Sequence, residues 1–171
     1  MVDFVHSKLY HKIFPKNRSK IDEKFYKKCL RLQFIKPENV LKNKNMINEN
    51  LCGECSKYIN DIDKKTTPME KIKYFGKAIS ILQNSINFSS GSKTLGIDDT
   101  LKPLIYVMVK AKPKNIFSNY NYCRIFLDTD LSKLQYGSLL TQMGMIINII
   151  KEMKYNELIG VTEEQFGFDE E

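Results

Sequence analysis

Apolar residues recur every three to four positions along most of the chain, the spacing typical of amphipathic helices. The pattern is strongest after Thr67-Pro68-Met69-Glu70, where an N-cap threonine, a first-turn proline and a capping-box glutamate mark a helix start. The apolar positions that follow are Ile72, Phe75, Ile79, Leu82 and Ile86. We therefore expect a helix that begins at this capping box and ends near Asn87.

A second strong pattern lies near the C-terminal end. Its apolar positions are Leu139, Met143, Ile146, Ile150 and Met153, and Ile147 and Ile149 widen the apolar face. The spacing predicts a helix from about Gly137 to Met153, and Gly144 permits another element to pack closely against it. Because the apolar face is wider than a small bundle needs, we expect part of it to remain open to a partner.

Weaker patterns predict three further helices and one short one. The three cover about Ile21–Gln33, Glu49–Asp61 and Asn115–Leu127, each with a polar back. A capping box at Thr162–Gln165 opens the short helix, which is expected to bury Phe166.

The apolar run LIYVMV, Leu104–Val109, is ambiguous, because its β-branched residues suit a buried strand as well as a helix. No second strand pairs convincingly with it, so a helix is the better interpretation. The run is too short to cross a bilayer, which needs about 20 apolar residues, and we expect it inside the protein. The chain is thus predicted to be all-α, a single layered domain of about six to eight helices.

Length and composition support one domain with an uneven charge. The 171 residues are 42% hydrophobic, enough chain to bury about two thirds of the unfolded surface. Of 27 basic and 20 acidic residues, 12 and 4 lie in residues 1–44, a net charge of +8, which leaves 15 and 16 for the remainder. We divide the chain into a basic N-terminal arm, residues 1–20, and one domain, residues 21–171.

The basic segment is rich in lysine, and nucleic acid is not an expected partner. The chain has only three arginines, whereas readers of phosphates and base edges favour the bidentate guanidinium; they are Arg18, Arg31 and Arg124. Weak contact of residues 1–44 with an anionic membrane stays open, at about 1 kcal/mol per well-placed lysine. The arm has apolar residues at helical spacing before Pro15, and we favour its docking on the chain's own core over membrane insertion.

The sequence carries no motif for enzymatic chemistry, and we expect neither a metal nor a cofactor. Cys52-Gly53-Glu54-Cys55 has the CxxC form, but no second pair lies at zinc spacing, so two helical thiols are the better interpretation. His6 and His11, the two histidines, lie in the arm. Without GxxxxGK[ST] or GxGxxG, nucleotide chemistry must come from a partner. The cysteine spacing and the lack of a signal peptide favour the cytoplasm.

Asp98 and Asp99 are adjacent carboxylates at the mouth of the apolar run. Such a pair can cap a helix, bind a metal, act as an acid or base, or reach into a partner. Taken alone, it is best explained by capping, since acidic residues at a helix N-terminus satisfy free N–H groups and the macrodipole.

Several segments, taken in order, resemble one known family. DDTLKPLIYVMVKAKP, which begins at Asp98, is followed by Ser118-Asn119 and then by YGSLLT, Tyr136 to Thr141, which opens an apolar helix. This succession resembles the vacuolar protein sorting nine domain, a family of exchange factors for endosomal Rab small GTPases. LRLQFIKPENV, TTPMEKIKYFGKAISIL and VTEEQF resemble its other segments, so that the resemblance covers nearly the whole chain.

The resemblance implies the site residues. Asp98 matches the family's aspartate finger, and Thr141 matches the threonine that contacts the GTPase. The other residues expected to contact the partner are Asp99, Lys102, Pro103, Ser138 and Leu139. The helices around 100–111 and 137–153 are expected to wall an apolar groove for the GTPase switch regions.

The resemblance also implies the activity. The protein is expected to be an exchange factor without covalent chemistry, hence not an enzyme in that sense. Its finger would enter the phosphate and magnesium site of a Rab protein of the early endosomal subfamily and promote GDP release. It would act in the cytoplasm, peripheral to endosomal membranes.

Two departures from the family pattern leave alternatives open. Lys102 stands where the family has a proline, with Pro103 one residue later, and Ser138 stands where it has a tyrosine. A non-catalytic Rab-binding or scaffold module of the same fold is one alternative. A peripheral membrane adaptor, working through the basic N-terminal segment, is another.

Overall fold

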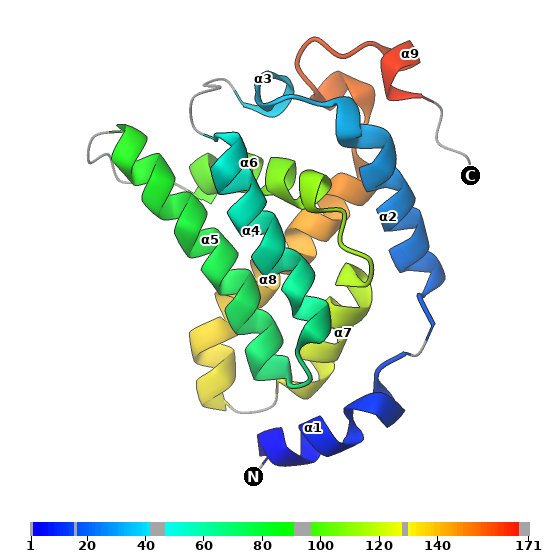
Figure 1. Ribbon diagram of the computed structural model, residues 1–171, viewed down its shortest axis with the longest axis vertical. Coiled ribbons are helices and arrows are strands. Elements are labelled where there is room, and N and C mark those ends of the chain that lie inside the picture. Colours follow the sequence, from blue (N-terminus) through cyan, green and yellow to red (C-terminus); the bar gives the residue numbers. More distant parts are fainter. Residues whose placement is uncertain (1, 16, 42–46, 91–96, 128–129, 168–171) are drawn as a thin grey trace.

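The computed structural model describes residues 2–15, 17–41, 47–90, 97–127 and 130–167, and Figure 1 presents their arrangement. Within these ranges the chain forms nine α-helices, three short 3-10 helices and no strand, which confirms the all-α prediction. In order they are α1 (Val2–Ile13), α2 (Lys20–Arg31), η1 (Leu32–Phe34), α3 (Pro37–Val40), α4 (Glu49–Asp61), η3 (Ile62–Lys64), α5 (Pro68–Ser90), α6 (Ile97–Ala111), α7 (Ile116–Phe126), α8 (Asp130–Glu152), η4 (Tyr155–Glu157) and α9 (Glu163–Phe166).

The centre of the fold is α6. Every side chain from Leu104 to Val109 is at most 9% exposed, because α2, α3, α4, α5 and α8 all pack against this helix. The ambiguous apolar run is therefore a helix, and a helix buried on all sides needs no polar face. Within the described residues, no helix is long and apolar enough to span a membrane.

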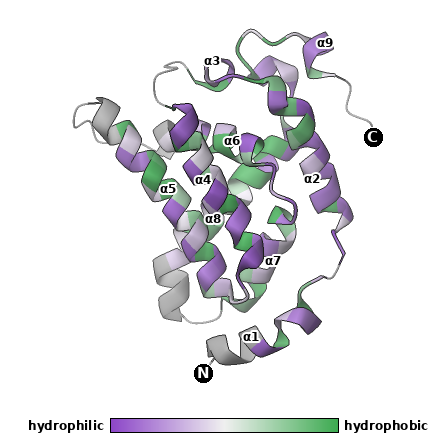
Figure 2. Cartoon of the chain, in the orientation of Figure 1, coloured by the Kyte–Doolittle hydropathy of each residue, from purple (hydrophilic) through white to green (hydrophobic). Residues whose placement is uncertain are grey.

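The helix α5 begins at the predicted capping box. The Glu70 backbone N–H donates to Thr67 Oγ1 at 3.2 Å, and the Thr67 backbone N–H donates back to the Glu70 carboxylate at 3.4 Å. The helix runs to Ser90, slightly beyond the predicted end. Its neighbour α4 has the predicted bounds and carries Cys52 and Cys55 as free thiols. Figure 2 colours both helices with mixed hydropathy, as expected for amphipathic helices.

The helix α8 begins well before the predicted Gly137, at Asp130. Glycine costs only about 1 kcal/mol inside a helix, and the residues before Gly137 are mostly good helix formers, so the helix continues through it. Gly144 does allow close packing, as predicted. A Cβ atom at that position would lie 2.8 Å from the ring of Tyr120 on α7.

Asp22 joins α2 to α7. The side chain is fully buried, and its Oδ1 accepts the backbone N–H groups of Phe117 and Ser118 at 2.8 and 3.3 Å. Its Oδ2 accepts the hydroxyls of Ser118 and Ser19 at 2.5 and 2.6 Å. A carboxylate at a helix N-terminus satisfies free N–H groups and the helix dipole, which explains why this acidic side chain can be buried.

The N-terminal arm docks on the core, as predicted, around the fully buried Lys71 of α5. Lys71 Nζ donates to Tyr10 Oη at 3.0 Å, to the Ile62 carbonyl at 3.0 Å and to Asn119 Oδ1 at 2.7 Å. It also lies 4.8 Å from the ring centroids of Tyr10 and Phe14. The cation is thus held by neutral oxygens and aromatic faces, which link α1, α5 and α7.

Burial lowers the pKa of Lys71 to about 8, and it raises the pKa of the Cys29, Cys55 and Cys123 thiols to about 12. Between pH 8 and the ordinary lysine pKa the unfolded chain holds a proton on Lys71 that the folded chain has lost, so this group makes the free energy of unfolding rise with pH. The thiols act in the opposite direction above about pH 9, since there the unfolded chain ionises first.

We predict that the free energy of unfolding of the wild type, minus that of Lys71→Met, increases by about 1 kcal/mol between pH 8 and pH 9. The thiols contribute equally to both proteins and cancel in the difference. Urea unfolding at several pH values measures it, with Lys57→Met, at an exposed position, as the control. A difference that stays constant across this range would show that Lys71 titrates normally in the folded state.

Candidate partner-binding groove

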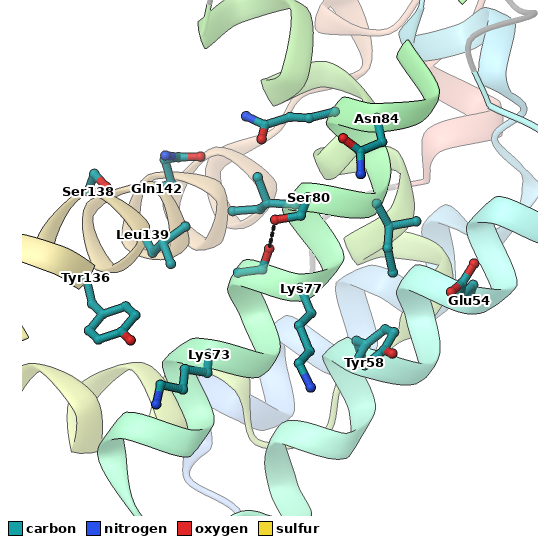
Figure 3. A pocket seen from close by; sticks show the side chains of 14 residues that line it. Glu54, Tyr58, Lys73, Lys77, Ser80, Asn84, Tyr136, Ser138, Leu139 and Gln142 are labelled. Carbon is teal, nitrogen blue, oxygen red and sulfur yellow. Dashed lines mark hydrogen bonds between the residues drawn. The ribbon is translucent and has the colours of Figure 1, made fainter. Parts of the chain in front are cut away.

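A groove of about 740 Å³ lies between α5 and α8, with α4 at its edge. Figure 3 shows its lining side chains. The helix α5 contributes residues from Lys73 to Asn84, α8 contributes Tyr136 to Gln142, and α4 contributes Glu54 and Tyr58. The face of α8 that begins near Leu139 therefore borders an open groove.

The groove has a tightly packed base where the two helices meet. Leu139 Cδ1 lies 2.8 Å from the position that a Cβ atom on Gly76 would occupy. Such a distance is too short for a real Cβ contact, so a Cβ atom at this position would require the end of the Leu139 side chain to move. Beside it, Ser80 Oγ donates to the Gly76 carbonyl at 3.0 Å, and the hydroxyl is thereby satisfied within the helix.

Lysines and tyrosines form one rim of the groove. Lys77 Nζ lies 4.8 Å from the ring centroid of Tyr74 and 5.7 Å from that of Tyr58. Lys73 Nζ lies 6.0 Å from the ring centroid of Tyr136, across the groove on α8. Cations held over aromatic faces keep their charge while the rings offer apolar surface. This rim suits a partner surface that is apolar with acidic neighbours.

The structure brings together some of the predicted site residues. Ser138 and Leu139 line the groove. Thr141 is exposed one turn along α8, where its hydroxyl donates to the Gly137 carbonyl at 2.9 Å. This hydroxyl can exchange its intrahelical bond for one to a partner, because it already faces solvent.

The remaining predicted residues belong to α6. Asp98 and Asp99 lie in its first turn, and their side chains are outside the described part of the structure. Lys102 is exposed, whereas Pro103 is buried inside the helix. Proline has no N–H, so the Asp99 carbonyl has no donor four residues later, and the helix is weakened just after its acidic turn.

This groove differs from the one that was predicted between the helices around 100–111 and 137–153. The wall opposite α8 is formed by α5 and not by α6, because the apolar side chains of α6 are buried in the core. The sequence pattern did not indicate Lys73, Gly76, Lys77 or Tyr136 as site residues. A glycine inside the strongest predicted helix was the available signal, since an interior glycine often marks a close approach.

Comparisons with known proteins point to one family. Residues 52–155, more than half of the chain, match the Vacuolar sorting protein 9 (VPS9) domain. The chain is 30% identical over 125 residues to Vacuolar protein sorting-associated protein 9A of Arabidopsis thaliana. These aligned residues make up 70% of this chain and 24% of the relative. The chain is 28% identical over 156 residues to the protein of that name from Oryza sativa subsp. japonica, covering 85% and 32%.

A third relative is Receptor-mediated endocytosis protein 6 homolog of Drosophila pseudoobscura pseudoobscura, 32% identical over 89 residues, which cover 52% of this chain and 5% of the relative. The chain spans a third or less of the length of each of these proteins. The chain belongs to the VPS9 domain family, as its resemblance implied. VPS9 domains are exchange domains for Rab GTPases.

The contact between Gly76 and Leu139 generates a stability prediction. Gly→Ala inside a helix normally stabilises by about 0.5–1 kcal/mol. We expect that gain for Gly53→Ala on α4, where a Cβ atom would meet nothing within 4 Å. Gly76→Ala should lack the gain, because the new methyl displaces Leu139 into the groove. Chemical unfolding of both variants measures the difference.

A double mutant tests whether Leu139 is the cause. In a Leu139→Ala background, Gly76→Ala should recover the gain seen at Gly53. Equal stabilisation by Gly53→Ala and Gly76→Ala in the wild-type background would contradict the close packing described above.

Proposed function

We propose that this chain is a guanine nucleotide exchange factor that promotes GDP release from an endosomal Rab GTPase. The observation that carries the proposal is the match of residues 52–155 to the VPS9 domain. The groove beside Ser138 and Leu139 supports it, because the resemblance implies that both residues contact the partner. The names of the relatives, which refer to vacuolar sorting and to receptor-mediated endocytosis, support a GTPase of the early endosomal subfamily.

In this proposal Asp98 is the aspartate finger. A GTPase holds GDP through a P-loop lysine, backbone N–H groups and Mg²⁺, all of which demand negative charge in a small site. A carboxylate that enters this site pairs with the lysine and weakens the hold on Mg²⁺. The exchange factor then prefers the nucleotide-free GTPase, and linkage requires that GDP binds more weakly in the complex. No covalent bond forms, so the protein is not an enzyme in the covalent sense.

The burial of α6 supports such a finger. The backbone of Asp98 belongs to the first turn of α6, and the turns that follow are buried from Leu104 onward. A finger that acts from this turn starts from backbone that is continuous with a buried helix, which supports the proposal. The protein acts in the cytoplasm, at the periphery of endosomal membranes.

A non-catalytic Rab-binding module is the second candidate, and two observations favour it. Lys102 places an exposed charge where the family has a proline, and Ser138 lacks the ring and hydroxyl of the family's tyrosine. Tyr136 lines the same groove from the same helix, so an aromatic ring with a hydroxyl still borders it. We therefore place exchange activity first.

We predict that Asp98→Ala lowers the rate of GDP release from the Rab protein by at least about tenfold, which is 1.4 kcal/mol of transition-state stabilisation. The reason is the loss of the carboxylate that replaces phosphate, and thermal stability should change little. Release of fluorescent GDP, measured over a panel of Rab proteins, gives the rate and the partner together.

Asp99→Ala is the matched control, since it removes the neighbouring carboxylate from the same turn. It should cost up to about 1 kcal/mol of folding stability through the helix dipole and keep much of the exchange activity. If Asp98→Ala kept the wild-type rate of GDP release and had a lower melting temperature, Asp98 and Asp99 would act only as helix caps. Binding to the nucleotide-free Rab protein without any acceleration by the wild type would establish the non-catalytic module instead.

A further inference from the structure

We infer that the exposed face of α2 is a docking surface for an anionic lipid membrane. Lys20, Lys24 and Lys27 are all exposed and follow the i, i+4, i+7 spacing that places them on one side of the helix. Glu23 is the acidic residue beside them, and it pairs with Lys27 at 3.5 Å with both side chains more than half exposed. Three lysines against this one glutamate leave the face with a net positive charge, and solvent screening makes the pair itself weak.

Two apolar side chains extend this basic face. Leu30 and Phe34, at the C-terminal end of α2 and in η1, are 44% and 40% exposed. Leu30 lies three residues after Lys27, about one turn further along α2, and Phe34 ends the η1 turn that follows directly. Basic residues beside exposed leucine and phenylalanine are typical of helices that lie in the membrane interface. In Figure 2 hydrophilic residues predominate along α2.

The opposite face of α2 is anchored, so the docking face is rigid. Phe25, Cys29 and Leu32 are at most 1% exposed, and the Asp22 carboxylate is held by α7. The helix therefore does not have to fold or detach in order to bind. A preformed surface loses little conformational entropy on binding, which favours contact through few residues.

The choice of lysine favours a lipid surface over a protein partner or a nucleic acid. Arginine is the residue that recognises individual carboxylates and phosphates in a fixed bidentate geometry, whereas lysine is a point charge on a flexible stem. Point charges are sufficient for the diffuse negative potential of a leaflet that contains anionic lipids. The helix α2 holds five basic and two acidic residues, a net charge of +3 within the +8 of residues 1–44, and this charge favours an orientation with α2 toward such a surface.

Binding through α2 leaves the groove free. The helix α2 packs on α6, α7 and α8, whereas the groove is formed by α4, α5 and the first half of α8. In Figure 1, α2 and α5 lie on opposite sides of the molecule. The inference does not depend on exchange activity, and membrane binding and GDP release are measured separately.

Sedimentation with vesicles tests the surface in the full chain. Vesicles of phosphatidylcholine with about one third phosphatidylserine should bind the wild type, pure phosphatidylcholine should not, and about 0.5 M salt should remove most of the binding. Each lysine near an anionic surface raises the partition coefficient about fivefold. The triple variant Lys20→Glu, Lys24→Glu, Lys27→Glu should therefore lower the partition coefficient at least about 100-fold.

The control triple variant is Lys57→Glu, Lys114→Glu, Lys154→Glu, which makes the same change in net charge at exposed positions outside α2. It should lose far less binding. Leu30→Ser combined with Phe34→Ser should weaken binding several-fold even at high salt, because it removes apolar insertion and no charge. All variants should melt like the wild type.

Two results would overturn the inference. Equal losses in the two triple variants would mean that net charge alone drives binding, without a dedicated face. If the wild type bound vesicles with and without phosphatidylserine equally, an anionic membrane would be excluded as the partner. The face would then fit an acidic protein partner instead.

Discussion

The burial of α6 on every side is the constraint on which the other helices depend. Six consecutive side chains, Leu104 to Val109, are removed from water, a gross gain on the order of 10 kcal/mol before the entropy of ordering the chain is counted. To cover them, α2, α4, α5 and α8 must surround one short helix. Because α6 has no free side along this run, partner binding is left to its first turn and to the outer helices.

Two buried polar side chains connect the N-terminal segment to this core. Asp22 is satisfied by the N-terminal N–H groups of α7, and Lys71 by oxygens and rings from three separate segments. Breaking such a tie would leave a buried charge without partners, which is costly. The segment before residue 52, where the VPS9 match begins, is therefore structurally integrated with the rest of the chain.

Two separate faces of the outer surface carry the two proposed binding sites. On one, Leu139 lies against Gly76 of α5, and lysines and tyrosines surround the groove. On the other, α2 presents lysines beside Leu30 and Phe34. A protein that binds a membrane through the second face and a GTPase through the first would raise the local concentration of both at one surface, which strengthens binding without any new contact.

The helices could be predicted from the sequence because they follow from local causes, namely apolar periodicity and the capping boxes at Thr67 and Thr162. Recognition of the family also followed, since its motifs are contiguous. The wall of the groove could not be predicted from the sequence. Lys73 and Lys77 have the pattern of an ordinary solvated helix face, and only the packing of α8 beside α5 makes them part of a groove. The roles of Asp22 and Lys71 were equally hidden, since their partners lie far away along the chain. The local sequence therefore determined the helices. Only long-range packing decided which polar side chains became buried contacts between helices and which helix faces remained exposed.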